Sequence, residues 1–156
     1  MLFRSGGIRG DKQYSAGSEI TRRDILTELP FGNLTVLAEI SGSQLLGALE
    51  NGFGKVEDGA GRFPQVSGMV ISADLKQPPG ARVVSVLVGG KPLDLAATYT
   101  LATNDFMLNG GDGYVGLAAK TLVGGNAGKL MANDVMALIK KQGSITSKVE
   151  GRIVLK

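Results

Sequence analysis

Hydrophobic and polar residues alternate along LTVLAEISG, residues 34–42. The side chains on one side of this segment are Leu34, Val36, Ala38 and Ile40, which is the pattern of a half-buried strand. Further strands are predicted where β-branched residues are frequent and turn sequences such as PPG and GGKP intervene, at residues 66–75, 83–90, 98–103 and 147–156. These segments are expected to form a mixed sheet.

A short helix is predicted to follow Thr21. Asp24 stands three residues after this N-cap, an acidic variant of the capping box, and Pro30 ends the helix. Its apolar face is expected to consist of Ile25, Leu26 and Leu29.

Two longer helices are predicted further along the chain. The first covers residues 41–54, with Ser41 or Ser43 as its cap and a glycine at its end. The second covers residues 132–143, with Asn133 as its cap and lysines before the final glycine. We expect both helices to lie against the sheet.

The composition fits a single folded domain. A chain of 156 residues with 43% hydrophobic and 20% charged residues has enough apolar surface to bury a core. Neither an internal repeat nor a long linker divides it, so residues 1–156 are expected to form one α+β domain. No apolar run approaches the roughly 18 residues that a membrane span needs, and we expect no membrane partner.

Histidine and cysteine are absent from the sequence. Their absence excludes an imidazole base, a thiolate nucleophile and the usual zinc and copper sites, because these need nitrogen or sulfur ligands. Only the chemistry of carboxylates and other oxygen ligands is left. The lack of cysteine fits a reducing cytosol and a periplasm equally, so it leaves the compartment open.

The net charge of +3 does not indicate a nucleic-acid partner. Lysines and arginines are scattered among 14 acidic residues, and only 5% of the residues are aromatic. Nucleic-acid binders usually gather basic residues on one face with aromatic residues between them. We therefore expect no nucleic-acid partner.

Three glycine-rich segments match known binding loops only in part. GGNAGKL, residues 124–130, lacks the glycine spacing and the final hydroxyl of a phosphate-binding loop. DGAGRF, residues 58–63, lacks the third glycine of a dinucleotide fingerprint. In NDFMLNGGDGY, residues 104–114, Phe106 and Leu108 stand where a calcium loop needs oxygen ligands. None of these three sites is predicted.

Loops at the ends of the predicted elements carry side chains of a different kind. The candidate residues are Arg9, Phe31, Asn33, Gly61, Phe106 and Asp112. Aromatic rings stack a base, a guanidinium pairs with phosphate oxygens, and a carboxylate accepts both hydroxyls of a ribose. Neighbouring glycines let the backbone approach a ligand closely. Together these residue types suit a nucleoside phosphate.

Each of these side chains also has a purely structural interpretation. Phe31 and Phe106 are also consistent with core residues at the ends of elements, and Arg9 with a solvated surface charge. Asp112 and Asn33 are also typical of turns beside glycine. The pattern alone therefore indicates an α+β domain with a candidate polar and aromatic site.

The motifs GGIR, PFGN, and NDF with NGGDGY occur in the order and approximate spacing of a known family. The sequence resembles the C-terminal domain of the 5'-nucleotidases, periplasmic and cell-surface metallophosphoesterases that include the UDP-sugar hydrolases. The resemblance extends from Ser5 through VEGRIVL, residues 149–155. It implies that this domain is the substrate-recognition half of a two-domain enzyme.

The resemblance also implies a role for each candidate residue. Phe31 and Phe106 match the two aromatic residues that hold the base, and Asn33 matches an asparagine that contacts it. Asp112 matches the carboxylate that binds the ribose, and Arg9 matches an arginine that binds the phosphate.

Gly61 matches a glycine whose backbone lies near the base.

One departure from the family is Arg4, which stands where an asparagine is common. The family's phosphate site also uses arginines from a helix that precedes the first motif. Its metal pair and general-acid histidine belong to an N-terminal metallophosphoesterase domain. Because this sequence has no histidine and no dense acidic cluster, we expect no cofactor within it.

The leading hypothesis is a nucleotide-recognition domain of a 5'-nucleotidase-type hydrolase of nucleotide catabolism, catalytically incomplete by itself. The alternative is a stand-alone nucleoside-binding module, or one that pairs with a separately encoded metal domain. A surface matching the metal domain would then be open to homodimerisation. The family also acts on cyclic nucleotides, UDP-sugars and sulfur compounds, and the two aromatic residues with Asp112 favour a nucleoside. The resemblance implies a periplasmic or extracellular location.

Overall fold

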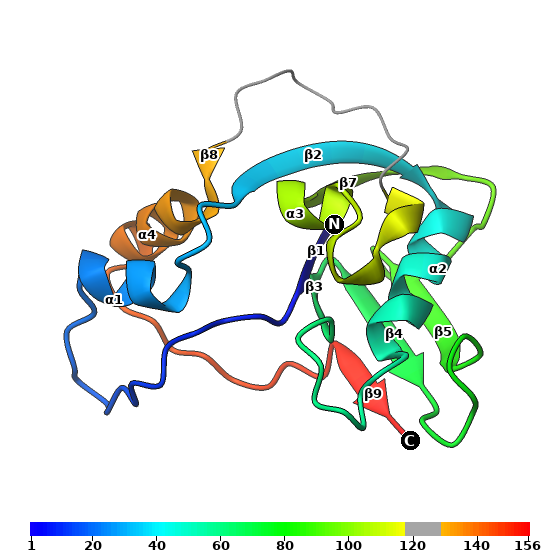
Figure 1. Cartoon of the computed structure of the whole chain (residues 1–156), viewed down its shortest axis with the longest axis horizontal. Helices are drawn as coiled ribbons and strands as arrows, with labels where there is room; N and C mark the ends of the chain where they lie inside the picture. Colours follow the sequence, from blue (N-terminus) through cyan, green and yellow to red (C-terminus); the bar gives the residue numbers. More distant parts are fainter. Residues whose placement is uncertain (118–128) are drawn as a thin grey trace.

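The computed structural model describes residues 1–117 and 129–156. These residues form two mixed β-sheets and the helices α1 to α4 (Figure 1). The predicted α+β class is confirmed, although the strands are divided between two sheets instead of one. Residues 124–128 of the rejected phosphate-loop candidate lie outside the described residues.

The first sheet has the strand order β3-β1-β7-β2-β8. Its strands, in chain order, are β1 (Leu2–Ser5), β2 (Leu34–Ser41), β3 (Pro64–Ser67), β7 (Thr98–Asn104) and β8 (Lys129–Leu130). β1 is parallel to β7, whereas β2 pairs antiparallel with β7, from Thr35 opposite Asn104 to Ser41 opposite Thr98. The C-terminal ends of β1 and β7 and the N-terminal end of β2 therefore meet at one end of this sheet.

The second sheet has the strand order β6-β5-β4-β9. Its strands are β4 (Met69–Ala73), β5 (Val83–Val88), β6 (Lys91–Pro92) and β9 (Ile153–Leu155). The prediction of one strand over residues 66–75 is wrong, because β3 and β4 belong to different sheets. Gly68 separates them with φ +75°, a backbone angle that glycine adopts readily. The predicted final strand over residues 147–156 is reduced to β9.

The helices are α1 (Arg22–Glu28), α2 (Gly42–Phe53), α3 (Asp105–Leu108) and α4 (Met131–Gln142). Thr21 and Asp24 form the predicted reciprocal capping box of α1. Of the two candidate caps of α2, Ser41 is the one that accepts a backbone hydrogen bond, from Gln44. None of the helices in the described part of the chain is long and apolar enough to cross a membrane.

The predicted Asn133 cap of α4 is wrong. The helix begins at Met131, directly after β8, and Leu130 occupies the N-cap position without a side-chain hydrogen bond. The Met131 N–H donates to the carbonyl of Asn33, at an N···O distance of 2.9 Å. A contact with the loop before β2 therefore satisfies a donor that a capping side chain often satisfies.

One hydrophobic core joins both sheets to α2. Its fully buried members include Phe3, Ile40 and Leu101 from the first sheet, Ile71 from the second, and Leu45, Leu49 and Phe53 from α2. A second, smaller cluster lies between α1 and α4 and contains Ile25, Leu29 and Ala132. This cluster anchors the end of α1, from which the chain continues through Pro30 to Phe31.

A buried arginine connects the end of α2 to the start of β5. The Arg82 guanidinium donates to the carbonyls of Phe53 (2.6 Å) and Gln77 (3.1 Å) and pairs with Glu57 (2.6 Å). The hydrogen bonds from Arg82 lower the pKa of the Glu57 carboxyl. The Glu50 carboxylate accepts the backbone N–H of Arg82 at 2.9 Å, so the two elements are joined from both directions.

We expect Arg82→Ala to lower the free energy of unfolding by about 2–3 kcal/mol, because it leaves a buried carbonyl without its charged donor. Denaturant unfolding followed by circular dichroism measures this loss. The control is Arg23→Ala, at an exposed position of α1, which should change the stability by less than about 0.5 kcal/mol. Equal stability of the two variants would show that the Arg82 network does not stabilise the fold.

Candidate functional site

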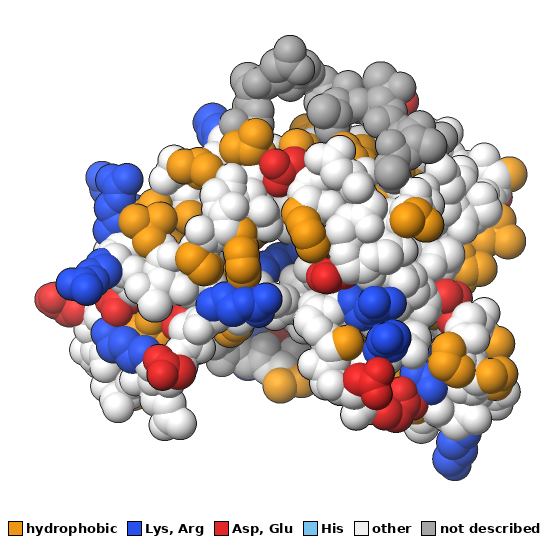
Figure 2. Space-filling view, viewed as in Figure 1, with side chains coloured by type: hydrophobic (Ala, Val, Ile, Leu, Met, Phe, Trp, Pro, Cys, Tyr) orange, Lys and Arg blue, Asp and Glu red, His pale blue; other side chains and the backbone are white. Residues whose placement is uncertain are grey.

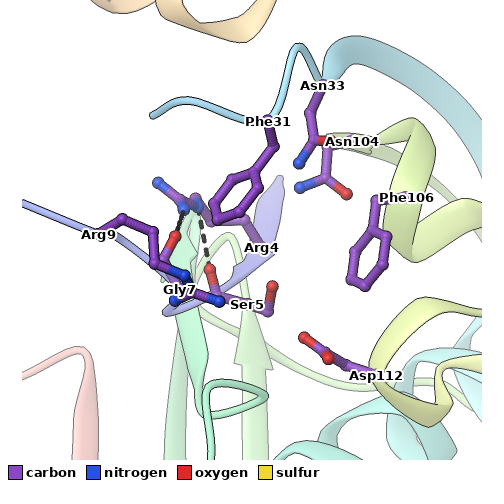
Figure 3. Close-up of a pocket in the computed structure, with 9 residues that line it drawn as sticks. All are labelled: Arg4, Ser5, Gly7, Arg9, Phe31, Asn33, Asn104, Phe106 and Asp112. Carbon is purple, nitrogen blue, oxygen red and sulfur yellow. Dashed lines mark hydrogen bonds between the residues drawn. The ribbon is translucent and has the colours of Figure 1, made fainter. Parts of the chain in front are cut away.

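The ends of β1, β2 and β7 surround a cavity of about 260 Å³. Figure 2 shows a hollow in the middle of the displayed face, bordered by hydrophobic, basic and acidic side chains. The cavity residues are Arg4, Ser5, Gly7, Arg9, Phe31, Asn33, Asn104, Phe106 and Asp112 (Figure 3). Five of the six residues predicted from the sequence are thus brought together, and Gly61 is not among the lining residues.

The two phenylalanines reach the cavity because β2 and β7 are antiparallel. Phe31 lies in the loop shortly before Leu34, where β2 begins, and Phe106 lies shortly after Asn104, where β7 ends. Their relative exposures are 47% and 44%, so neither ring is a core residue. Both rings extend into the cavity in Figure 3, with open space between them.

One carboxylate ties the two aromatic loops together. Asp105 Oδ1 accepts the backbone N–H of Leu34 at 2.9 Å and that of Phe106 at 3.0 Å. Leu34 is the first residue of β2, and Phe106 lies in the first turn of α3. Asp105 therefore fixes the position of the Phe106 backbone relative to the chain that carries Phe31.

Asn104 is a lining residue that the sequence did not single out. Its side chain is almost completely buried, and its Oδ1 accepts the Met107 N–H at 2.8 Å as the N-cap of α3. An asparagine directly before a short apolar segment is a recognisable capping signal. That signal predicts the start of a helix. It does not predict that Asn104 lines the cavity, which follows from its place at the end of β7 in the sheet.

The glycine-rich loop after α3 has an unusual backbone. Asp112 has φ +54°, the only positive φ of a non-glycine residue in the described part of the chain, and Gly110 and Gly113 have φ +87° and +82°. Asparagine and aspartate tolerate this left-handed conformation better than most residues. Asn51 Nδ2 donates to the Asp112 carbonyl at 3.1 Å. This loop presents the exposed Asp112 carboxylate at the cavity.

Gly111 leaves space for an aromatic ring. A Cβ added at this position would lie 2.5 Å from carbon atoms of the Phe106 ring, much closer than van der Waals contact. The ring therefore rests against the Gly111 backbone. This contact explains one of the glycines around Asp112, and the positive φ of Gly110 and Gly113 explains two others.

Arg9 lies beside the first aromatic loop. Its guanidinium carbon is 4.9 Å from the centroid of the Phe31 ring, within the range of a cation–π interaction. The backbone N–H of Arg9 donates to the Glu28 carbonyl at 3.1 Å. Among the described residues no carboxylate forms an ion pair with Arg9, so its charge is available to a ligand.

Arg4 also lines the cavity, although the sequence marked it only as a departure from the family. Its Nε donates to the Ser5 carbonyl at 3.0 Å and its Nη2 to the Gly7 carbonyl at 2.8 Å. Partial burial lowers the pKa of the guanidinium. The signal available in the sequence was an arginine that only Ser5 separates from two glycines.

Gly61 lies in the exposed loop before β3. Its neighbour Arg62 donates from Nη1 to Asn51 Oδ1 at 3.2 Å, and Asn51 in turn holds the Asp112 carbonyl. The loop is thus connected to the glycine-rich loop through side chains. A role for the Gly61 backbone near a ligand stays a prediction.

The cavity has the chemistry of a binding site. Asp112 is the only acidic residue among its lining residues, and the described residues contain no group of three or more His, Cys, Asp or Glu side chains that could hold a metal ion. Two guanidiniums, two aromatic rings and one carboxylate offer charge pairing, stacking and hydrogen bonds.

Comparison with known proteins identifies the chain's relatives. The model of the family described as "5'-nucleotidase, C-terminal domain" matches residues 2–119. The trifunctional nucleotide phosphoesterase protein YfkN of Bacillus subtilis is 38% identical over 160 residues, which cover 97% of this chain and 10% of that protein. Protein 5NUC of Lutzomyia longipalpis is 37% identical over 171 residues, covering 99% of this chain and 29% of that protein.

A solved structure has the same fold. The 5'-nucleotidase precursor of Thermus thermophilus superimposes with a TM-score of 0.89 at 38% sequence identity, covering 99% of this chain and 31% of the other. The chain therefore spans less than a third of the length of each of these three proteins.

We expect Gly111→Ala to displace the Phe106 ring, because the added methyl group would overlap it. The ring proton chemical shifts of Phe106 measure this displacement by NMR. The control is Gly116→Ala, in the short 3-10 turn that follows, where an added Cβ meets no atom of the described residues within 4 Å. Unchanged Phe106 shifts in the Gly111 variant would contradict the contact.

Proposed function

The chain belongs to the family of 5'-nucleotidase C-terminal domains, and from this premise we propose that it is the nucleotide-recognition domain of a larger phosphohydrolase. The observation that carries the proposal is the cavity at the end of the first sheet. Two exposed phenylalanine rings, an arginine without an ion pair among the described residues and a carboxylate line the same space. Each of these groups matches one part of a nucleotide.

The base occupies the space between Phe31 and Phe106. Stacking on an aromatic ring contributes about 1–3 kcal/mol per base and depends little on which base is stacked. The roughly half-exposed rings support this role, because each leaves a large apolar face in water until a ligand covers it. Asn33 lies beside Phe31 in the lining, and its amide contacts the edge of the base.

The ribose and the phosphate occupy opposite sides of the cavity. Asp112 accepts hydrogen bonds from the ribose hydroxyls, since an ionised carboxylate has several acceptor sites. Arg9 binds the phosphate with its fork of N–H donors. The separation of Asp112 from Arg9 in Figure 3 supports this assignment, because it keeps the carboxylate away from a bound phosphate.

Hydrolysis takes place in a partner domain. We propose an N-terminal metallophosphoesterase domain that supplies the metal pair, which activates water and stabilises charge on the phosphoryl oxygens. This chain spans less than a third of the length of each relative, which supports the presence of a second domain. Rotation about a hinge then carries the bound nucleotide to the metals, as in other domain closures. The residues of this chain bind and orient the substrate.

A nucleoside-binding module that works alone, or with a separately encoded metal domain, is the second candidate. Its basis is that residues of this chain supply the aromatic rings, the guanidiniums and the carboxylate that line the cavity. Formation of a homodimer stays a prediction, and sedimentation analysis of the purified chain tests it.

We expect the purified chain to bind adenosine, and Phe106→Ala and Asp112→Asn each to weaken this binding about tenfold, since each removes a contact of at least about 1.4 kcal/mol. Isothermal titration calorimetry measures the affinities. Tyr14→Ala removes an exposed aromatic ring outside the lining residues, and Asp58→Asn removes an exposed carboxylate outside them. Both controls should bind adenosine like the unmodified chain. Equal affinities in all five proteins would overturn the proposed site.

A further inference from the structure

We propose that Arg4 is a second anion-binding residue of the cavity and that Arg4 and Arg9 together form a phosphate site within this chain. The inference rests on the proposed function and deepens it. It assigns to Arg4 the preference of the site for a phosphorylated ligand over a nucleoside.

The two guanidiniums lie on either side of one glycine. Arg4 Nη2 is 2.8 Å from the carbonyl oxygen of Gly7, and Arg9 Nη1 is 3.7 Å from the position that a Cβ of Gly7 would occupy. Figure 3 shows both guanidiniums on the side of the cavity opposite Asp112. A single phosphate group placed near Gly7 is therefore within reach of two arginines.

The charges around Gly7 are not balanced by an acid. In the described part of the chain, the ion pairs involve Lys12, Arg82 and Arg152, and neither Arg4 nor Arg9 belongs to one. The neighbouring Glu28 carboxylate accepts instead from the Gly10 N–H at 3.0 Å and from the Tyr14 hydroxyl at 3.2 Å. Two like charges close together disfavour each other, and an anion placed between them removes that repulsion.

Burial adds to this imbalance at Arg4. The guanidinium is partly withdrawn from water, and desolvation lowers its pKa, which means that the charged form is less favourable here than in solution. A desolvated charge gains more from an opposite charge than an exposed one does, because water screens the attraction less. The structural carbonyl contacts of Arg4 do not neutralise it.

Arg4 is held in place and still has free donors. Two of its five N–H groups bond the carbonyls of Ser5 and Gly7, so the orientation of the guanidinium is fixed before a ligand arrives. Among the described residues, the other three N–H groups have no hydrogen-bond partner, including both on Nη1. An immobilised fork of donors suits the oxygens of a phosphate and loses little entropy when it binds.

Arg4 also has a simpler role, which is to hold the turn that leads to Arg9. The two roles differ in what they do to different ligands. Loss of a turn contact moves the whole loop and affects adenosine and AMP alike. Loss of a phosphate contact affects AMP and leaves adenosine unchanged.

The test is calorimetric titration of the full 156-residue chain and of Arg4→Gln with adenosine and with AMP. We expect Arg4→Gln to weaken AMP binding about tenfold, the effect of losing a hydrogen bond to a charged group, and to change adenosine binding by less than about twofold. AMP affinity should also fall less steeply with salt in the variant, because one charge pair with the phosphate is missing.

The matched control is Arg152→Gln. Arg152 also donates to a backbone carbonyl, that of Val66 at 2.6 Å, and it lies outside the cavity lining. This variant loses the same positive charge and should bind both ligands like the unmodified chain. Arg4→Lys serves as a second variant if Arg4→Gln does not fold. Lysine keeps the positive charge but lacks the fork of donors. We therefore expect the preference of Arg4→Lys for AMP over adenosine to be weaker than that of the unmodified chain, but stronger than that of a chain with no cation at position 4.

The outcomes separate the inference from the proposed function. If Arg4→Gln lost adenosine and AMP binding equally, or lost neither, the role of Arg4 would be overturned, whereas the proposed nucleoside binding by the unmodified chain would stand. Failure of the unmodified chain to bind either ligand would overturn the proposed function and the inference with it.

Discussion

The antiparallel pairing of β2 with β7 is the constraint on which the rest of the site depends. It places the start of one strand beside the end of the other, so the loop of Phe31 and the helix turn of Phe106 meet although 75 residues of sequence separate them. The Asp105 carboxylate then joins the two strand ends by accepting the Leu34 N–H. The parallel β1 ends at the same end of the sheet and adds the two arginines.

The scaffold and the cavity follow different physical rules. In the scaffold, α2 and both sheets bury large apolar side chains around residues such as Phe53 and Leu49, which stabilises the fold through burial of apolar surface. At the cavity, two phenylalanine rings stay roughly half exposed, Asp112 adopts a positive φ, and two arginines line the same space. Each of these features is unfavourable in the free protein, and under the proposed function a bound nucleotide would cover the rings and pair with the arginines.

Predictions from the sequence were accurate where a short stretch of chain decides the structure. The capping box at Thr21 and the cap of α2, for which the sequence offered Ser41 or Ser43, involve partners at most three residues away, so these signals are visible in the sequence. The predictions were wrong where contacts with a distant segment of the chain decide the structure. Nothing local indicated that Gly68 divides two sheets, or that the Asn33 carbonyl receives the first N–H of α4 in place of a cap at Asn133.

The sequence by itself determined the α+β class, most of the helices and strands, and five of the residues that line the cavity, because residue type and spacing report local backbone preference and loop chemistry. Only the tertiary structure decided which loops share a space. It added Arg4 and Asn104 to the lining and left Gly61 outside it. The physical reason is that burial and proximity are set by strand pairing between distant segments, and in this chain one sheet end turns separate loops into one cavity.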